Sequence, residues 1–100
     1  MSTFTHPTPD EFDLPQVLYA LGDPTRLSIV RKLADCEGLS CGDVCCDTPR
    51  STLTHHLKIL RESGLIVTEK QGQTHFNSLR KTDLEKRFPG LLKNVLQQPA

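Results

Sequence analysis

The segment from Thr48 to Gly64, TPRSTLTHHLKILRESG, constrains the fold more than any other part of the chain, because it has the pattern of one helix with both ends marked. We expect the Thr48 hydroxyl to cap the helix and Pro49 to occupy its first position, where the missing N–H costs nothing. We expect Gly64 to end the helix in a left-handed conformation. One face carries an apolar stripe at i, i+4 and i+7, formed by Leu53, Leu57 and Leu60. This face is predicted to pack on a core.

The opposite face carries short polar side chains and ends in a cation: Ser51, Thr54, His55 and Lys58. A surface with few charges in its first two turns suits contact with bases and phosphates. The two adjacent histidines separate on the helix. His56 falls on the apolar stripe and is predicted to be packed and hydrogen-bonded, whereas His55 falls on the polar face and is interpreted as a contact residue. The alternative is that both histidines are structural residues whose hydrogen bonds are made within the protein.

The segments before this helix predict a helix-turn-helix. We expect helices over residues 14–21 and 24–36, with Asp23 as the cap of the second. Ser40 then opens a short helix that ends by residue 47. A short helix, a tight turn and a longer helix with a polar face form a helix-turn-helix, and its second helix is the candidate reader of the major groove.

After Gly64 the apolar pattern changes from helical to alternating. Residues 65–70 and 74–79 are predicted strands joined by a turn at Gly72, with Phe76 pointing inward. The tip of this hairpin carries cations and amides, so it can lie against the phosphate backbone or enter the minor groove as a wing. The alternative is a plain solvated hairpin.

The two ends of the chain have different compositions. Residues 1–13 are polar and predict a flexible arm, and residues 14–98 form one domain. Thr82 is predicted to cap a helix that Pro89 and Gly90 interrupt. Apolar side chains at both ends of the domain exceed the need of a small core, and we assign them to a homodimer interface: Leu14, Val17, Leu18, Leu21, Leu91, Leu92, Val95 and Leu96. The predicted fold is mainly α with a β-hairpin wing, a winged helix-turn-helix that dimerises through its terminal helices.

The chain has 12 basic and 12 acidic side chains, so any affinity for nucleic acid must come from local asymmetry. Acids cluster at residues 10–13 and 35–47, whereas residues 50–61 are basic. The chain shows no secretion signal and no membrane-spanning run, so we expect a cytoplasmic protein without a membrane partner. It shows no nucleophile–base–orienter set, so we do not expect an enzyme.

The segments ALGDPTRLSIVRKL and STLTHHLKILRESGLI, followed by a glycine-centred wing, resemble the ArsR/SmtB family over residues 14–96. The resemblance is to a subgroup with an RSTLTHHLK reading helix and an RFPGLL tail. It implies a small homodimeric repressor that binds an inverted repeat in double-stranded DNA until an effector releases it. By position, it places four side chains at base edges: Ser51, Thr52, Thr54 and His55. It places five others on phosphates: Arg50, Lys58, Lys70, Gln73 and His75.

Three cysteines lie close together in the short helix and just after it: Cys41, Cys45 and Cys46. Three interpretations stay open. They could hold a soft ion such as As(III), Cu(I) or Zn(II), sense oxidants as reactive thiols, or pack as small hydrophobic residues. The family's metal patterns do not map, because Ser40 and Gly42 stand where its Cys-x-Cys-Asp cysteines would fall. No histidine follows His75, so we reject the family's C-terminal zinc site, and no cofactor is assigned with certainty.

Two other functions compete with DNA binding. The first is a thiol-based redox or metal-binding protein that uses the three cysteines, although the chain lacks a Cys-x-x-Cys motif in a βαβ setting. The second is a winged helix that binds another protein instead of DNA. Such a protein would show no salt-dependent affinity for DNA.

Overall fold

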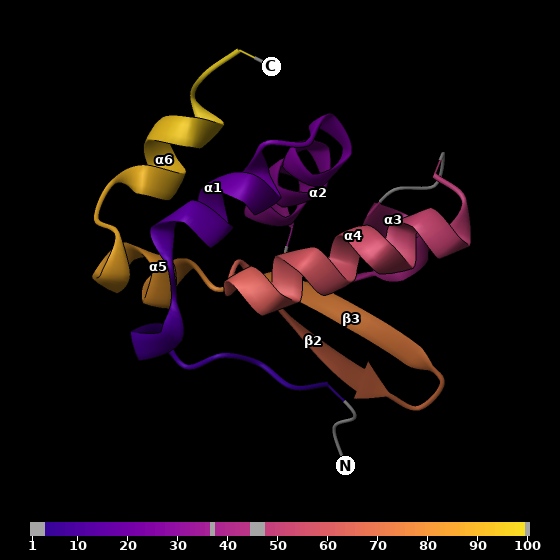
Figure 1. Cartoon of the computed structure of the whole chain (residues 1–100). Helices are drawn as coiled ribbons and strands as arrows, with labels where there is room; N and C mark the ends of the chain where they lie inside the picture. Colours follow the sequence, from indigo (N-terminus) through magenta and orange to yellow (C-terminus); the bar gives the residue numbers. More distant parts are fainter. Residues whose placement is uncertain (1–3, 37, 45–47, 100) are drawn as a thin grey trace.

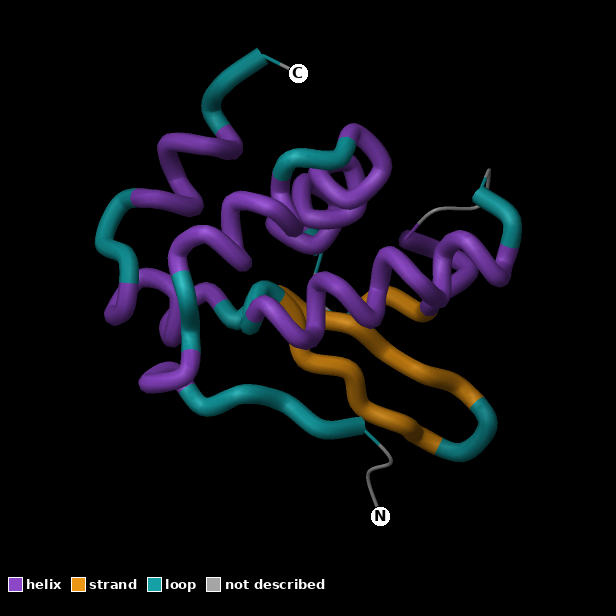
Figure 2. The backbone as a smooth tube through the Cα atoms, viewed as in Figure 1, coloured by secondary structure: helices purple, strands orange, loops and turns teal. Residues whose placement is uncertain are grey.

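Helices pack around a small antiparallel sheet in the computed structural model, which describes residues 4–36, 38–44 and 48–99 (Figure 1). The described elements, in chain order, are η1 (Pro9–Glu11), α1 (Leu14–Leu21), α2 (Pro24–Asp35), β1 (Leu39–Ser40), α3 (Cys41–Val44), α4 (Arg50–Ser63), β2 (Ile66–Gln71), β3 (Thr74–Leu79), α5 (Lys81–Arg87) and α6 (Leu91–Leu96). The three strands are arranged in the order β1-β3-β2, with α4 lying across the hairpin (Figure 2). This arrangement confirms the predicted winged helix-turn-helix.

The helix caps agree with the sequence in part. Asp23 caps α2 as predicted, because its Oδ2 accepts hydrogen bonds from the amides of Thr25 at 2.9 Å and Arg26 at 3.1 Å. The predicted start of α4 is wrong by one residue. Pro49, in an extended conformation with ψ of 143°, is the N-cap, and its carbonyl accepts the first helical hydrogen bond from the Leu53 amide at 2.9 Å. The proline therefore precedes the helix instead of opening it.

The hairpin is confirmed, with Gly72 in the turn at a φ of +63°. The inward residue of β3 was predicted wrongly. Asn77 is fully buried, whereas Phe76 is half-buried on the other face. The buried Asn77 side chain has hydrogen-bond partners for both of its polar atoms. Its Oδ1 accepts from the Thr68 hydroxyl at 2.7 Å, and its Nδ2 donates to the Leu39 carbonyl at 3.3 Å. A hydrophobic pattern cannot indicate such a polar network.

Strand β1 was not expected from the sequence. It has two residues, which pair with Asn77 and Phe76 of β3. Two residues are too short to show an alternating pattern, so only its partner strand reveals it. The strand leads directly into α3, where the Ser40 hydroxyl donates to the Asp43 carboxylate at 2.9 Å. This contact agrees with the prediction that Ser40 opens the short helix.

The C-terminal segment forms two separate helices. The predicted Thr82 cap is wrong, because α5 begins at Lys81 with Arg80 as its N-cap. The Arg80 guanidinium instead pairs with the Asp83 carboxylate at 3.1 Å. Gly90 lies in the left-handed region at a φ of +79° and precedes α6, so the tail splits at the predicted Pro89–Gly90 break.

The core includes Phe12, which belongs to the segment predicted to be a flexible arm. Its side chain is 3% exposed and lies against Gly64, the left-handed C-cap of α4. The first described residues of this segment run beside β2 in the lower part of Figure 1, and η1 lies beside α5. The packed unit therefore begins before residue 14, in contrast to the predicted boundary. In the parts of the chain that the structure describes, no helix has the length and apolar character needed to cross a bilayer.

Candidate nucleic-acid interface

One side of α4 is a continuous polar surface. Six of the side chains predicted to contact DNA are exposed on it or at its start: Arg50, Ser51, Thr52, Thr54, His55 and Lys58. The opposite side is buried as predicted by Leu53, Leu57 and Leu60, which are at most 6% exposed. Ile59 is also buried, at 8% exposure. Packing of this apolar side fixes α4 on the core and leaves the polar side free to enter a groove.

Thr54 has a more restricted chemistry than the sequence indicates. Its hydroxyl donates a hydrogen bond to the Arg50 carbonyl one turn earlier, at 2.9 Å. The donor is therefore used within the helix, and the group offers its oxygen lone pair and its methyl group to a ligand. A methyl group of this kind suits contact with a thymine methyl in the major groove.

His56 is packed and hydrogen-bonded, as predicted, with its side chain 12% exposed. Its Nδ1 lies 3.1 Å from Nη1 of Arg26. An arginine can only donate, so Nδ1 accepts and the ring proton is on Nε2, which lies 3.9 Å from the Asp23 carboxylate. The Arg26 amide, and then the neighbouring His56 ring and the Thr25 amide, hold the pKa of Asp23 below its usual value against the effect of burial.

The same buried Arg26 joins three helices. Its Nε donates to the Ala20 carbonyl at 2.7 Å and its Nη2 to the Tyr19 carbonyl at 3.1 Å. These carbonyls belong to the last turn of α1, which lacks the usual i+4 donors. The Tyr19 carbonyl also accepts from the Gly22 amide at 3.2 Å. Arg26 therefore connects the end of α1, through α2, to His56 on α4. The sequence showed the Gly-Asp-Pro-Thr-Arg segment but not this connection.

The wing presents its predicted residues in two ways. Lys70 and Gln73 are exposed at the tip, near the turn at Gly72. His75 is half-buried, and its ring meets the ring of Phe4 edge-to-face, with 5.0 Å between centroids. Lys70 and His75 are directly opposite each other on the two strands.

Arg61 is a basic residue of the interface region that the site prediction omitted. It lies one turn beyond Lys58 on α4 and is half-buried. Its guanidinium carbon lies 4.4 Å from the centre of the Phe4 ring, and its Nη1 lies 3.5 Å from the Thr68 hydroxyl. The spacing from Lys58 is visible in the sequence, whereas the contact with Phe4 depends on tertiary structure alone.

The predicted cysteine site is mostly outside the described residues. Cys45 and Cys46 fall in the undescribed segment, and of Cys41 only the backbone, at the start of α3, is described. Cys36 is an exposed free thiol at the end of α2. Within the described ranges, no three histidine, cysteine or acidic side chains lie close enough together to hold a metal ion. The three interpretations of the cysteines therefore stay predictions.

The residues assigned to a dimer interface divide into three groups. Leu14 and Leu18 are exposed on α1, at 41% and 47%, beside Tyr19 at 60%, which the prediction omitted. Val17 and Leu21 are buried in their own chain, at 0% and 6%, and so differ from the prediction. The four apolar residues of α6 are half-buried against the core: Leu91, Leu92, Val95 and Leu96.

Comparison with known proteins agrees with this geometry. The helix-turn-helix domain family matches residues 21–69. The uncharacterised HTH-type transcriptional regulator YceK of Bacillus subtilis (strain 168) is 39% identical over 83 residues, which cover 80% of this chain and 83% of that protein. An arsenical resistance operon repressor of Staphylococcus aureus is 34% identical over 80 residues, 73% of this chain and 71% of the repressor. The solved structure of HlyU from Vibrio cholerae N16961 shares 31% identity with a TM-score of 0.68, over 82% of this chain and 86% of that one. The chain therefore belongs to the ArsR family of winged helix-turn-helix, DNA-binding transcriptional regulators.

Proposed function

We propose that this protein is a repressor that binds an inverted repeat in double-stranded DNA as a homodimer, and that an effector releases it. The observation that carries the proposal is the polar side of α4, whose six exposed side chains lie opposite a buried leucine stripe. No carboxylate interrupts the sequence from Arg50 to Arg61, so the groove-facing side does not repel phosphates.

The residue roles follow from chemistry and position. Four short or planar polar groups on α4 would read base edges in the major groove: Ser51, Thr52, Thr54 and His55. Five others would fix the register on the phosphate backbone: Arg50, Lys58, Lys70, Gln73 and His75. The arsenical resistance operon repressor of Staphylococcus aureus supports repression. HlyU of Vibrio cholerae is named a transcriptional activator, so a reporter assay must measure the direction of regulation.

The exposed side chains of α1 support a homodimer. Leu14, Leu18 and Tyr19 place two aliphatic groups and an aromatic ring in contact with solvent on one short helix. A second copy that covers them would supply a second α4, and two half-sites on one DNA face require the two reading helices to lie about 34–36 Å apart. An inverted repeat is the DNA counterpart of such a two-fold protein.

Binding to DNA tests the proposal directly. The probes are a labelled duplex from the region upstream of the protein's own gene and a shuffled duplex of equal length, each titrated at several salt concentrations. We expect Lys58→Ala to weaken binding to both duplexes and to reduce the slope of log K against log salt by about one unit. His55→Ala should change the preference between the duplexes. Lys86→Ala, an exposed lysine on α5, is the matched control.

The outcomes separate the roles. An unchanged salt slope for Lys58→Ala would exclude its contact with phosphate, and equal weakening of both duplexes by His55→Ala would exclude base reading. Wild-type protein that binds neither duplex at low salt would refute DNA binding and leave the winged helix as a protein-binding unit. If the protein without DNA has the mass of one chain in solution, the homodimer is contradicted.

The effector is tested on the reduced protein–DNA complex. Titration with an oxidant, As(III) or Zn(II) shows whether the cysteines release DNA: Cys41, Cys45 and Cys46. Cys45→Ser keeps DNA binding if the protein is a regulator, whereas a thiol-based buffer would lose its activity. We place the protein in the cytoplasm, where its DNA target lies, and we propose no catalytic activity, since its relatives are transcriptional regulators.

A further inference from the structure

The N-terminal segment of residues 4–12 connects the reading helix to the wing. Its first residues run beside β2, and its N-terminal end lies next to the distal half of the hairpin (Figure 1). Phe4 is half-buried there and contacts two elements at once. Its ring meets His75 of β3 edge-to-face at 5.0 Å, and Arg61 of α4 stacks over it at 4.4 Å. One side chain therefore joins the two parts of the proposed DNA interface.

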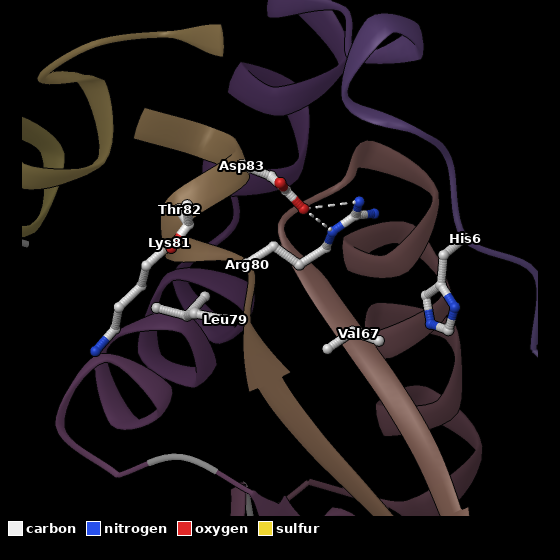
Figure 3. Close-up of a pocket in the computed structure, with 7 residues that line it drawn as sticks. All are labelled: His6, Val67, Leu79, Arg80, Lys81, Thr82 and Asp83. Carbon is white, nitrogen blue, oxygen red and sulfur yellow. Dashed lines mark hydrogen bonds and ion pairs between the residues drawn. The ribbon is translucent and has the colours of Figure 1, made fainter. Parts of the chain in front are cut away.

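His6 holds the same segment on the sheet. Its Nε2 accepts a hydrogen bond from the Thr68 amide at 3.0 Å. Thr68 belongs to β2, the edge strand of the sheet, so this amide points away from β3 and His6 provides its acceptor. Figure 3 shows His6 beside Val67, across a pocket of about 440 Å³ from the Arg80–Asp83 ion pair.

The base of the segment is fixed more firmly. Phe12 is buried in the core, and Arg80 stacks over its ring at 4.9 Å. Nη1 of Arg80 donates to the Pro7 carbonyl at 2.7 Å, and Arg87 donates to the Phe12 carbonyl at 3.4 Å. These contacts anchor residues 7–12, and Phe4 and His6 extend from them toward the wing.

The wing needs such support because the sheet ends early. Strand β1 reaches only Asn77 and Phe76, so among the described strands residues 70–75 pair only with each other. An isolated two-stranded hairpin is at best marginally stable in water. Its position relative to α4 therefore depends on contacts beyond the sheet.

We propose that Phe4 and His6 are positioning residues that set the distance and angle between the wing and α4. They thereby determine whether the wing residues, such as Lys70, reach the phosphates when α4 lies in the major groove. This inference rests on the proposed function, because it assumes that the wing contacts DNA. It also predicts a property of the free protein, which is order in the wing.

The first test uses hydrogen exchange of the full chain without DNA. We expect Phe4→Ala to speed amide exchange in residues 68–75 about two- to fivefold, which is the loss of one cation–π contact at an exposed site. Amides near Leu57 and Leu60 in the core should keep their protection. Phe4→Tyr retains the ring and should restore slow exchange, and Thr5→Ala, at an exposed neighbour, should have no effect. Equal exchange of the wing in the wild type and in Phe4→Ala would overturn the inference.

The second test measures DNA binding by the same variants on the upstream and shuffled duplexes. We expect Phe4→Ala, like Lys70→Ala, to weaken both complexes and to make the salt slope shallower by about one phosphate contact. Adding Phe4→Ala to Lys70→Ala should cause little further loss, because both act through the wing.

The DNA-binding results for Phe4→Ala can overturn the inference in two ways. Tighter binding by Phe4→Ala would mean that the segment masks Arg61, and an unchanged salt slope would mean that Phe4 has a packing role only; both overturn the inference. If the wild-type protein binds neither duplex, the role in DNA binding falls together with the proposed function. In that case the exchange experiment still shows whether Phe4 orders the wing.

Discussion

Replacing Gly64 by alanine tests how rigidly the N-terminal segment is held. Gly64 ends α4 at a φ of +92°, a region that L-residues rarely adopt. A Cβ at this position would lie 2.3 Å from Cε1 of Phe12, closer than any real contact. Gly72 provides the matched control, because it has a φ of +63° and a Cβ there would meet nothing within 4 Å. The two substitutions share the backbone cost and differ in the clash.

The expected losses of unfolding free energy follow from the backbone cost and from the clash with Phe12. The left-handed conformation costs an alanine about 1–2 kcal/mol, and this is the whole expected effect at Gly72. At Gly64 the Phe12 ring must also move within a packed core, which adds about 1–3 kcal/mol as overpacking does elsewhere. Effects of the lost glycine on the unfolded chain are similar at both sites and cancel in the comparison. We therefore expect Gly64→Ala to lower the free energy of unfolding by about 1–3 kcal/mol more than Gly72→Ala.

Urea unfolding at one fixed protein concentration is the appropriate assay, because the proposed dimerisation would make stability depend on concentration. The double variant Gly64→Ala/Phe12→Ala should lose less stability than the sum of the single variants, because the clash is absent without the ring. Equal losses for Gly64→Ala and Gly72→Ala, with additive behaviour in the double variant, would refute the reasoning. Phe12 would then move aside freely and could not anchor the segment.

Three further predictions concern other contacts. Arg26→Ala should lower the free energy of unfolding by about 2–4 kcal/mol in urea, because the buried Ala20 carbonyl and the His56 ring lose their donor, and Arg26→Lys should recover only part of this loss. Burial, and then the charges of Arg80 and Arg61, lower the pKa of His6 from 6.5, against the effect of Glu69. As the pH falls below 6.5, the unfolded chain binds a proton at His6 before the folded chain does, so the free energy of unfolding should decrease until the pH reaches the folded pKa. Urea unfolding measured from pH 7.5 to 5 should show this decrease in the wild type, and His6→Gln should abolish the part that His6 contributes. Leu18→Asp, at a side chain that is 47% exposed, should reduce the sedimentation mass from two chains to one of 11.2 kDa, and an unchanged mass would contradict the α1 interface.

The local elements could be predicted because their signals are local. The leucine stripe of α4, the Asp23 cap, the Gly64 stop and the Gly72 turn each depend on residues within a few positions, and each is confirmed. The separation of His56 from His55 followed from helical periodicity alone, since adjacent residues lie about 100° apart. The polar side of α4, and with it most of the candidate interface, was visible for the same reason.

Apart from the start of α4 and the Thr82 cap, the errors concern contacts between distant segments. The pattern of β3 favoured Phe76 as the buried residue, but Asn77 is inside because Thr68 and Leu39 satisfy its amide. Val17 and Leu21 resembled interface residues because a sequence does not show how much core the rest of the chain provides; α1 buries both. The polar composition of residues 1–13 suggested a flexible arm, whereas the Phe12 side chain is buried in the core and packs against Gly64.

The sequence by itself determined the order of the longer helices and of the two hairpin strands, and the helix that presents a polar side. These properties arise from periodicity, caps and turn residues, which act over one or two turns of chain. The resemblance to the family rested on two sequence motifs, around Asp23 and His55. Only the tertiary structure decided that Arg26 joins α1 to His56 and that Phe4 joins α4 to the wing. Such contacts depend on the distance between side chains that are far apart in the chain, and that distance is set when the core packs.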